Sequence, residues 1–379
     1  MIWKVIRTIA ISLVILSLLS GCNMMLPKPG IQPTPMPASA ATSVSALALP
    51  TQSVTKLIPI QEWKVNAGAI AWSMDSSIFA VVGDEDDSNE TTGIYAYSIH
   101  STNKLWFYHG PGIGLDLTFS PNNQVVATPF YGSVIELAVS SGKLVKEIDD
   151  QQAVGGKTCI DKLGIRFSPD GTEIFTLNTS FDNFASTAIY EWNIETNQCV
   201  RTFLSEPGGE TGFELSRDGK FLVLALDAIP IQPAQGIYDK QVQVWNIATQ
   251  QKICSFRDAR PISLIPNGKV IAAASVGKPG AVDLWDVSSC QRIDTLQRYE
   301  SKPPYSVAFS PNGQYLAIGG VETVQLWQVA SRKLLFESDR LQNNVKLQAF
   351  SPNGEYLLSE TDRTSINDKA TITLWKITP

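Results

Sequence analysis

The stretch FSPNGQYLAIGGVETVQLWQV, residues 309–329, decides the fold. The tetrad Ser-Pro-Asn-Gly at 310–313 is typical of a tight turn, because proline presets φ, asparagine bonds its own backbone and glycine accepts a positive φ. The apolar run 315–318 that follows predicts a strand buried on both faces. The alternating segment 324–329 has a period of two and predicts a further strand.

The same unit recurs along the chain. Copies of the turn segment begin at Trp72, Phe119, Phe167, Leu215, Leu264, Phe309 and Phe350. Copies of the alternating segment begin at Ile94, Val134, Ile189, Val242, Val282, Val324 and Ile372. Seven copies in residues 55–379 give about 46 residues each, which is typical of propeller blades with four antiparallel strands. The fold class predicted is therefore all-β, a seven-bladed β-propeller.

The repeats resemble those of WD-repeat propellers across residues 55–379, in a loose form. Only Trp285-Asp286 is a true Trp-Asp pair, and the Gly-His dipeptide of that family is absent. The family's Asp-His-Ser-Trp hydrogen-bond network is therefore expected to be missing, so that apolar packing holds the blades. Tryptophans at one position of the repeat are expected in the core, namely Trp192, Trp245, Trp285, Trp327 and Trp375.

The two ends of the repeat region are expected to share one blade. The last alternating strand ends at Ile377, two residues before the end of the sequence, so the seventh blade lacks a fourth strand. The segment Lys56–Val65 precedes the first blade and has nothing else to pair with. Pairing these segments would remove two exposed sheet edges that could otherwise promote aggregation.

The first residues predict export and lipid attachment. Lys4 and Arg7 precede a short apolar run that ends in Leu-Ser-Gly-Cys at 19–22, and this pattern resembles the lipobox of bacterial lipoproteins. The resemblance implies a signal peptide over 1–21 and a diacylglyceryl and acyl anchor on Cys22. The Pro-, Ala- and Ser-rich segment 22–54 is interpreted as an extended tether. The domain would then lie outside the cytoplasm, at the membrane of a bacterial cell envelope.

Composition excludes several functions. Net charge is −6, whereas nucleic-acid binding needs a surplus of Lys and Arg. Two histidines leave little material for zinc sites or histidine acid–base chemistry. We therefore expect a monomeric, non-catalytic scaffold for a protein or peptide, the role that the WD-repeat resemblance implies, with no cofactor besides the lipid. The alternative is an enzyme or ligand sensor that resembles propeller lactonases or glycoside hydrolases.

Charged residues on the innermost strands are candidates for that alternative. Arg166 and Glu214 occupy the same position in neighbouring blades, one residue before the turn segment's aromatic or leucine. Asp116 lies on the inner strand of the second blade and could take part in an ion pair or in a ligand site with them. These residues form an inter-blade ion pair or face the channel mouth as ligand groups.

Long connections between second and third strands are candidates for partner binding. They occur over 178–188, 227–240 and 359–370, on one face of the predicted ring. These connections place aromatic and charged residues at that rim, a mixture suited to binding a protein or peptide: Phe181, Phe184, Asp227, Tyr238 and Arg363. Loop variation without a partner is the competing interpretation.

The acidic loop 84–90 is a weak calcium candidate. Asp84, Asp86 and Asp87 could supply oxygen ligands, but the loop lacks the glycine and the fixed spacing of a calcium loop. Solvated acids are the favoured interpretation.

Four cysteines besides Cys22 allow three disulfide connectivities in an exported protein: Cys159, Cys199, Cys254 and Cys290. The last three fall at or near the start of a fourth strand on one rim. Because the outer edges of adjacent blades diverge, no pair is predicted.

Overall fold

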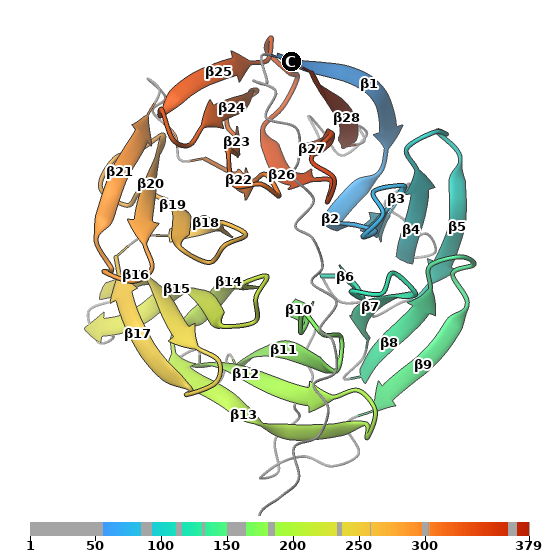
Figure 1. The fold of residues 1–379 in the computed structure, drawn as a ribbon, viewed down its shortest axis with the longest axis horizontal. Coiled ribbons are helices and arrows are strands. Elements are labelled where there is room, and N and C mark those ends of the chain that lie inside the picture. The colour runs from blue at the N-terminus through green and yellow to red at the C-terminus, as the bar shows by residue number, and fades with distance from the viewer. Residues whose placement is uncertain are drawn as a thin grey trace, which may run out of the picture. The chain divides into compact units, whose positions relative to one another are not determined.

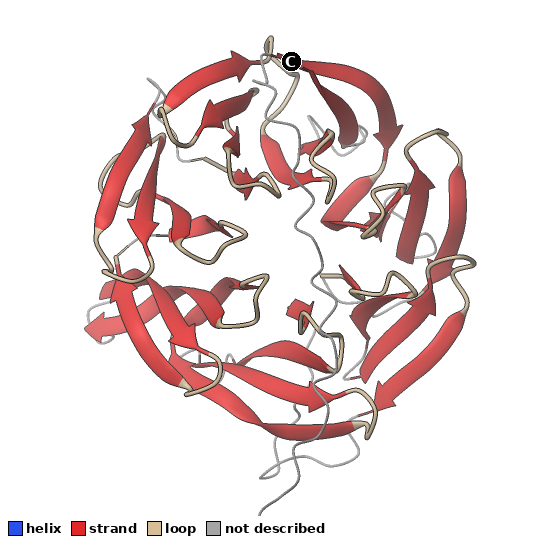
Figure 2. Cartoon of the chain, viewed as in Figure 1, coloured by secondary structure: helices blue, strands red, loops and turns tan. Residues whose placement is uncertain are grey.

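The computed structural model describes residues 56–84, 93–110, 116–130, 133–149, 164–180, 186–232, 237–257, 259–297, 302, 304–362 and 370–378. All regular secondary structure in these ranges is β-strand, arranged in seven sheets of four antiparallel strands (Figure 2). Within the compact unit Leu49–Pro379, the sheets surround a central axis as blades (Figure 1). The predicted seven-bladed β-propeller is confirmed.

Blades 1 to 3 each contain four consecutive strands, with the first innermost and the last outermost (Figure 1). Blade 1 comprises β2 (Asn66–Trp72), β3 (Ile78–Asp84), β4 (Gly93–Ser98) and β5 (Lys104–His109). Blade 2 comprises β6 (Thr118–Phe119), β7 (Val125–Phe130), β8 (Ser133–Ala138) and β9 (Leu144–Asp149). Blade 3 comprises β10 (Gly164–Phe167), β11 (Glu173–Ser180), β12 (Ser186–Asn193) and β13 (Gln198–Pro207).

Blades 4 to 6 repeat this order. Blade 4 comprises β14 (Gly209–Leu215), β15 (Phe221–Gln232), β16 (Ile237–Asn246) and β17 (Gln251–Phe256). Blade 5 comprises β18 (Ala259–Leu264), β19 (Val270–Ala274), β20 (Ala281–Asp286) and β21 (Arg292–Gln297). Blade 6 comprises β22 (Ser306–Phe309), β23 (Tyr315–Gly319), β24 (Val324–Gln328) and β25 (Lys333–Glu337).

Blade 7 joins the two ends of the propeller. Its first three strands are β26 (Val345–Phe350), β27 (Tyr356–Thr361) and β28 (Thr371–Thr378), and its outer strand is β1 (Lys56–Lys64). The register runs antiparallel from Lys56 opposite Thr378 to Lys64 opposite Thr371. The predicted closure by the N-terminal strand is confirmed.

The Ser-Pro-Asn-Gly turn is held by its serine. In blade 6, Ser310 Oγ donates to Asn312 Oδ1 at 2.7 Å and accepts from the Tyr315 backbone N–H at 2.9 Å. Gly313 adopts the expected positive φ of 68°. Equivalent serines are buried in six blades: Ser73, Ser120, Ser168, Ser216, Ser310 and Ser351. Blade 5 has Ile265 instead, and this side chain packs into the core between blades 5 and 6.

The core lies between the blades. We call each interface between adjacent blades a seam and name it by their numbers. Each of the seven seams contains one cluster of buried hydrophobic side chains drawn from both blades. In seam 7/1, Trp63 of β1 meets Phe79 of β3 edge-to-face, with ring centroids 4.8 Å apart. Hydrophobic packing between blades therefore holds the propeller together, as the sequence predicts.

Apolar packing is not the whole support of the blades, because the tryptophans also donate hydrogen bonds. Trp192 Nε1 donates to Thr176 Oγ1 at 3.1 Å, and Trp375 Nε1 donates to Ser359 Oγ at 2.7 Å, each on the neighbouring second strand. Trp245 and Trp327 donate at 3.0 Å to a glutamine two residues earlier on their own strands. A hydroxyl or an amide thus replaces the histidine-based network. Trp192, Trp327 and Trp375 are buried, whereas Trp245 and Trp285 are half-buried.

Candidate functional site

Asp116 lies two residues before the inner strand of blade 2, β6, and contacts blade 3. Its carboxylate accepts hydrogen bonds from the backbone N–H groups of Leu117 at 2.9 Å and Ile165 at 3.1 Å. It also forms an ion pair with the guanidinium of Arg166. Three donors, two of them from β10, hold the carboxylate across seam 2/3.

Arg166 continues these contacts to blade 4. Besides Asp116, its NH1 atom donates to the Ile165 carbonyl at 2.6 Å. The guanidinium carbon lies 5.4 Å from the ring centroid of Phe213 on β14, within the range of a cation–π contact. About a third of the side chain is exposed.

Glu214 extends the contacts to blade 5. Its Oε2 atom accepts from the Leu264 backbone N–H at 2.7 Å, across seam 4/5. Burial raises the pKa of Glu214 to about 7, although the Leu264 hydrogen bond and the positive charge of Arg166 lower it. Asp116, Arg166 and Glu214 therefore form one series of inter-blade contacts across blades 2 to 5, and Glu214 is the member that could exchange a proton near neutral pH.

Another carboxyl with a strongly raised pKa, that of Glu360, was missed by the sequence analysis. Glu360 on β27 is only 3% exposed, and its Oε1 atom accepts from the Ala67 backbone N–H on β2 at 2.7 Å. Burial raises its pKa to about 8, while the Ala67 hydrogen bond and the positive charge of Lys346 lower it. The available signal was an acid in a second strand that other blades fill with apolar or small residues, such as Val82, Ala225 and Ala274.

The predicted rim residues fall where side chains are not described. Phe181, Phe184 and Arg363 lie outside the described residues. Asp227 and Tyr238 lie on β15 and β16, opposite Gly209 and Pro230 respectively, and only their backbones are described. The strands themselves are informative: β15 has 12 residues and β16 has 10, against 5 and 6 in β19 and β20 of blade 5. Blade 4 therefore carries a β-hairpin that is longer than the corresponding hairpin of blade 5.

The acidic loop is described at one position only. Asp84 ends β3 and accepts a hydrogen bond from Asn66 Nδ2 at 2.8 Å, while Asp86 and Asp87 lie outside the described residues. Among the described residues, no group of three or more His, Cys, Asp or Glu side chains is placed to hold a metal ion.

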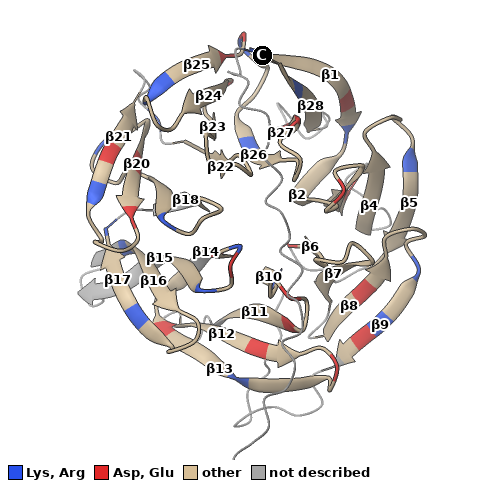
Figure 3. Cartoon of the chain, in the orientation of Figure 1, with Lys and Arg blue, Asp and Glu red and all other residues tan. Residues whose placement is uncertain are grey.

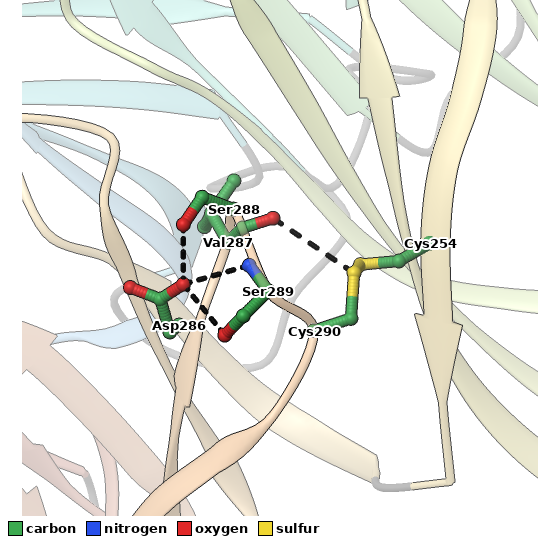
Figure 4. The surroundings of a disulfide bond; sticks show 6 residues. All are labelled: Cys254, Asp286, Val287, Ser288, Ser289 and Cys290. Carbon is green, nitrogen blue, oxygen red and sulfur yellow. Dashed lines mark hydrogen bonds between the residues drawn. A yellow bond between two sulfur atoms is a disulfide. The ribbon is translucent and has the colours of Figure 1, made fainter.

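Cys254 and Cys290 form a disulfide between blades 4 and 5 (Figure 4). No pair was predicted from the sequence. Cys290 lies in the turn between β20 and β21 and reaches Cys254 on β17 with a Cα–Cα distance of 6.0 Å, although the outer edges of adjacent blades diverge. Cys199 packs at the hydrophobic cluster of seam 2/3. Cys22 and Cys159 lie outside the described residues.

Among the residues that the structure describes, charges are spread over the ring rather than gathered into one basic face. Figure 3 shows Lys and Arg alternating with Asp and Glu around the outer strands, while the inner strands carry few charges. Outer-strand cations form ion pairs, Arg201 with the buried Glu191 of β12 at 2.7 Å and Lys252 with Glu206 of β13 at 3.0 Å. This distribution does not provide the basic stripe that nucleic acid requires.

Part of the chain is similar to known repeat proteins. Residues 290–328, from the turn before β21 to the end of β24, match the family model "WD domain, G-beta repeat". In sequence and architecture, this propeller resembles WD-repeat proteins. The rice (Oryza sativa subsp. japonica) protein Pre-mRNA-processing factor 19 is 28% identical over 151 residues, which cover 38% of this chain and 26% of that protein.

Two further relatives show the same pattern. WD repeat-containing protein VIP3 of Arabidopsis thaliana is 32% identical over 150 residues, or 34% of this chain and 46% of that protein. Small ribosomal subunit protein RACK1y of rice is 25% identical over 138 residues, or 34% of this chain and 39% of that protein. Each match covers less than half of the relative. Within the part of the chain that the structure describes, no helix has the length and hydrophobicity needed to span a bilayer.

Proposed function

We propose that this protein is a non-catalytic scaffold that binds a protein or peptide partner at the face carrying its long strand connections. A WD-repeat propeller is consistent with a protein-interaction scaffold. The observation that carries the proposal is the β15–β16 hairpin, whose pairing continues to Gln232 opposite Ile237. Its distal sequence, Ala228–Tyr238, has no charged residue and includes three isoleucines and a tyrosine, a composition suited to an interface core.

The inner carboxylates support this reading over catalysis. Asp116 already accepts from three donors, and Glu214 accepts from the backbone of the next blade. Groups engaged in this way position blades, whereas a catalytic acid or base must be able to reach a substrate proton.

The experiment compares capture by the propeller with capture by a hairpin variant. Replacing residues 228–239 with Asn-Gly would join β15 and β16 through a two-residue turn. The matched control shortens the connection between β19 and β20, residues 276–280, to the same dipeptide. A captured protein that binds the purified control normally and the hairpin variant at least tenfold more weakly supports the proposal. Equal binding to both variants contradicts it.

We also propose that the chain is anchored to a bacterial envelope membrane through lipid on Cys22, with the propeller outside the cytoplasm. The lipobox-like sequence and the Cys254–Cys290 disulfide support this address, since disulfides persist in oxidising compartments. Expression in a bacterial host fed an alkyne-labelled fatty acid should label the chain, and Cys22→Ala should abolish the label. A mature chain without acyl mass at Cys22 would contradict the anchor.

Glu214 favours a second candidate function, a propeller enzyme or ligand sensor. Its pKa of about 7 lies in the range of a general acid or base at neutral pH. A panel of lactones and glycosides tests this candidate. Hydrolysis that is lost in Glu214→Gln, with an unchanged unfolding temperature, would replace the scaffold proposal with this one.

A further inference from the structure

One outer-strand position recurs at the seams. In every blade, one outer-strand residue lies opposite the residue that precedes the tryptophan position of the third strand. In blades 1 to 5 these residues are Trp106 opposite Ala96, Lys146 opposite Glu136, Arg201 opposite Glu191, Cys254 opposite Val244 and Asp294 opposite Leu284. In blades 6 and 7 they are Phe336 opposite Leu326 and Gln61 opposite Leu374. Blades 1 to 5 therefore present one equivalent side chain each toward the next blade.

A second position recurs in the turn between third and fourth strands. Five residues there, each five positions after the tryptophan position, have a positive φ between 55° and 66°. They are Gly142, Asn197, Gln250, Cys290 and Arg332 in blades 2 to 6. The left-handed conformation makes the same tight turn in each blade and brings it to the outer strand of the preceding blade.

The outer-strand position contacts the turn region of the next blade with different chemistry from seam to seam. In seam 1/2, Trp106 lies against Gly142, where an added Cβ would approach its ring to 2.6 Å, and Trp106 Nε1 donates to the Val139 carbonyl at 2.8 Å. In seam 2/3, Lys146 Nζ donates to the carbonyl of Ile194, three residues before the turn residue.

Two further seams use polar side chains. In seam 3/4, the Gln250 amide lies against the Arg201 guanidinium, and with its oxygen assigned to that side it accepts from Arg201 Nε at 3.0 Å. In seam 5/6, Asp294 and Arg332 form an ion pair. The disulfide Cys254–Cys290 occupies the same two positions in seam 4/5.

The turn that carries Cys290 is itself anchored. Asp286 Oδ1 accepts from Ser288 Oγ at 2.6 Å, from the Ser289 N–H at 2.7 Å and from Ser289 Oγ at 2.8 Å (Figure 4). The aspartate of the single Trp-Asp pair therefore fixes the backbone that presents Cys290 to β17. The Cα–Cα distance of 6.0 Å lies within the usual range for a disulfide.

We propose that Cys254–Cys290 is a redox-dependent clasp, the covalent form of a contact that the neighbouring seams make without a covalent bond. Oxidation joins the two sulfurs and releases two protons and two electrons to a disulfide oxidant, such as oxidised glutathione, which leaves as two thiols. Reduction reverses the step and leaves seam 4/5 with two small side chains where its neighbours have an ion pair or hydrogen bonds. The seam that loses this clasp belongs to blade 4, which carries the extended β15–β16 hairpin.

The test uses the full chain in detergent with Cys159→Ser and Cys199→Ser, which prevents exchange with other thiols. A reductant should lower the unfolding temperature by about 5 °C, given the 36-residue separation of the two cysteines. The same reductant should not change the unfolding temperature of the double variant Cys254→Ser/Cys290→Ser. Equal unfolding temperatures with and without reductant would overturn the proposal, as would alkylation of both thiols after treatment with oxidised glutathione.

A second variant tests whether the positions are equivalent. Cys254→Asp/Cys290→Arg transfers the seam 5/6 pair to seam 4/5 and should unfold about 1–2 °C above the double serine variant under reducing conditions. That gain should disappear at high salt, because ion pairs at the surface are screened. A variant no more stable than the double serine variant would overturn the equivalence of the clasp positions.

Discussion

Blade 7 and seam 4/5 hold their strands together in different ways. Blade 7 pairs strands from opposite ends of the propeller, so its closure is made by eight backbone register pairs between β1 and β28 and by side chains of β1 packed into two seams. Seam 4/5 joins consecutive blades and adds a disulfide at its outer rim. Backbone pairing and apolar burial therefore carry the closure between distant segments, while the covalent bond reinforces a seam between neighbours.

The largest expected effect is at the non-covalent closure. Trp63 is 4% exposed in seam 7/1, so Trp63→Ala should reduce the free energy of unfolding by about 3–5 kcal/mol, measured by urea denaturation. Ile60 on the same strand is 48% exposed, and Ile60→Ala should change it by less than about 0.5 kcal/mol. Similar losses in both variants would mean that β1 does not depend on burial in seam 7/1.

The same seam should respond to pH through Glu360. Its pKa rises from an ordinary 4.5 to about 8 in the folded state, so between these values the native protein holds a proton that the unfolded chain has lost. Its contribution to stability is therefore complete below about pH 4.5 and falls as pH rises toward 8, by about 2 kcal/mol or more. The difference in unfolding free energy between the unmodified protein and Glu360→Gln should follow this slope. A difference that is flat with pH would contradict the assignment.

Seam 2/3 provides an intermediate case, a polar but non-covalent contact. Asp116→Ala leaves the Ile165 N–H and the Arg166 guanidinium without this acceptor and should cost about 1–3 kcal/mol in thermal or urea unfolding. A double-mutant cycle with Arg166→Met isolates the pair, and the coupling should be smaller than the single loss because Arg166 is partly exposed. No measurable loss in Asp116→Ala would show that the contact does not hold the seam.

The smallest effect concerns the turns, where blade 5 differs from the others. Ser310→Ala removes the hydroxyl that accepts from Tyr315 N–H and should cost about 1 kcal/mol. Ser331 lies in an exposed turn of the same blade, and Ser331→Ala should change stability by less than about 0.5 kcal/mol. An equal effect of both substitutions would mean that the buried serine does not organise the turn.

The sequence predicted those features that depend on the backbone period. Blade number, the Ser-Pro-Asn-Gly turn and the placement of Lys56–Val65 beside the last strand all follow from counting strands and unpaired edges. The tryptophan hydrogen bonds were not predicted, because the acceptors Thr176, Ser359, Gln243 and Gln325 come from two different positions of the repeat.

The candidate site was predicted less completely. The sequence selected Asp116, Arg166 and Glu214 from their inner-strand positions, but which donors each carboxylate meets depends on how far one blade is rotated against the next. The disulfide was not predicted because Cys254 lies on β17, whereas Cys290 lies in a left-handed turn of the next blade, at a different position of the repeat. Phe181, Phe184, Asp227, Tyr238 and Arg363 stay predictions, with side chains outside the described residues.

Hydrogen exchange measured by mass spectrometry, with and without reductant, compares the two closures most directly. We predict that reduction raises exchange in β17 and in the turn 287–291, while β1 and β28 stay protected. Exchange that rises first in β1 and β28, or that does not change in β17, would contradict the view that backbone pairing closes the ring and the disulfide clasps only seam 4/5.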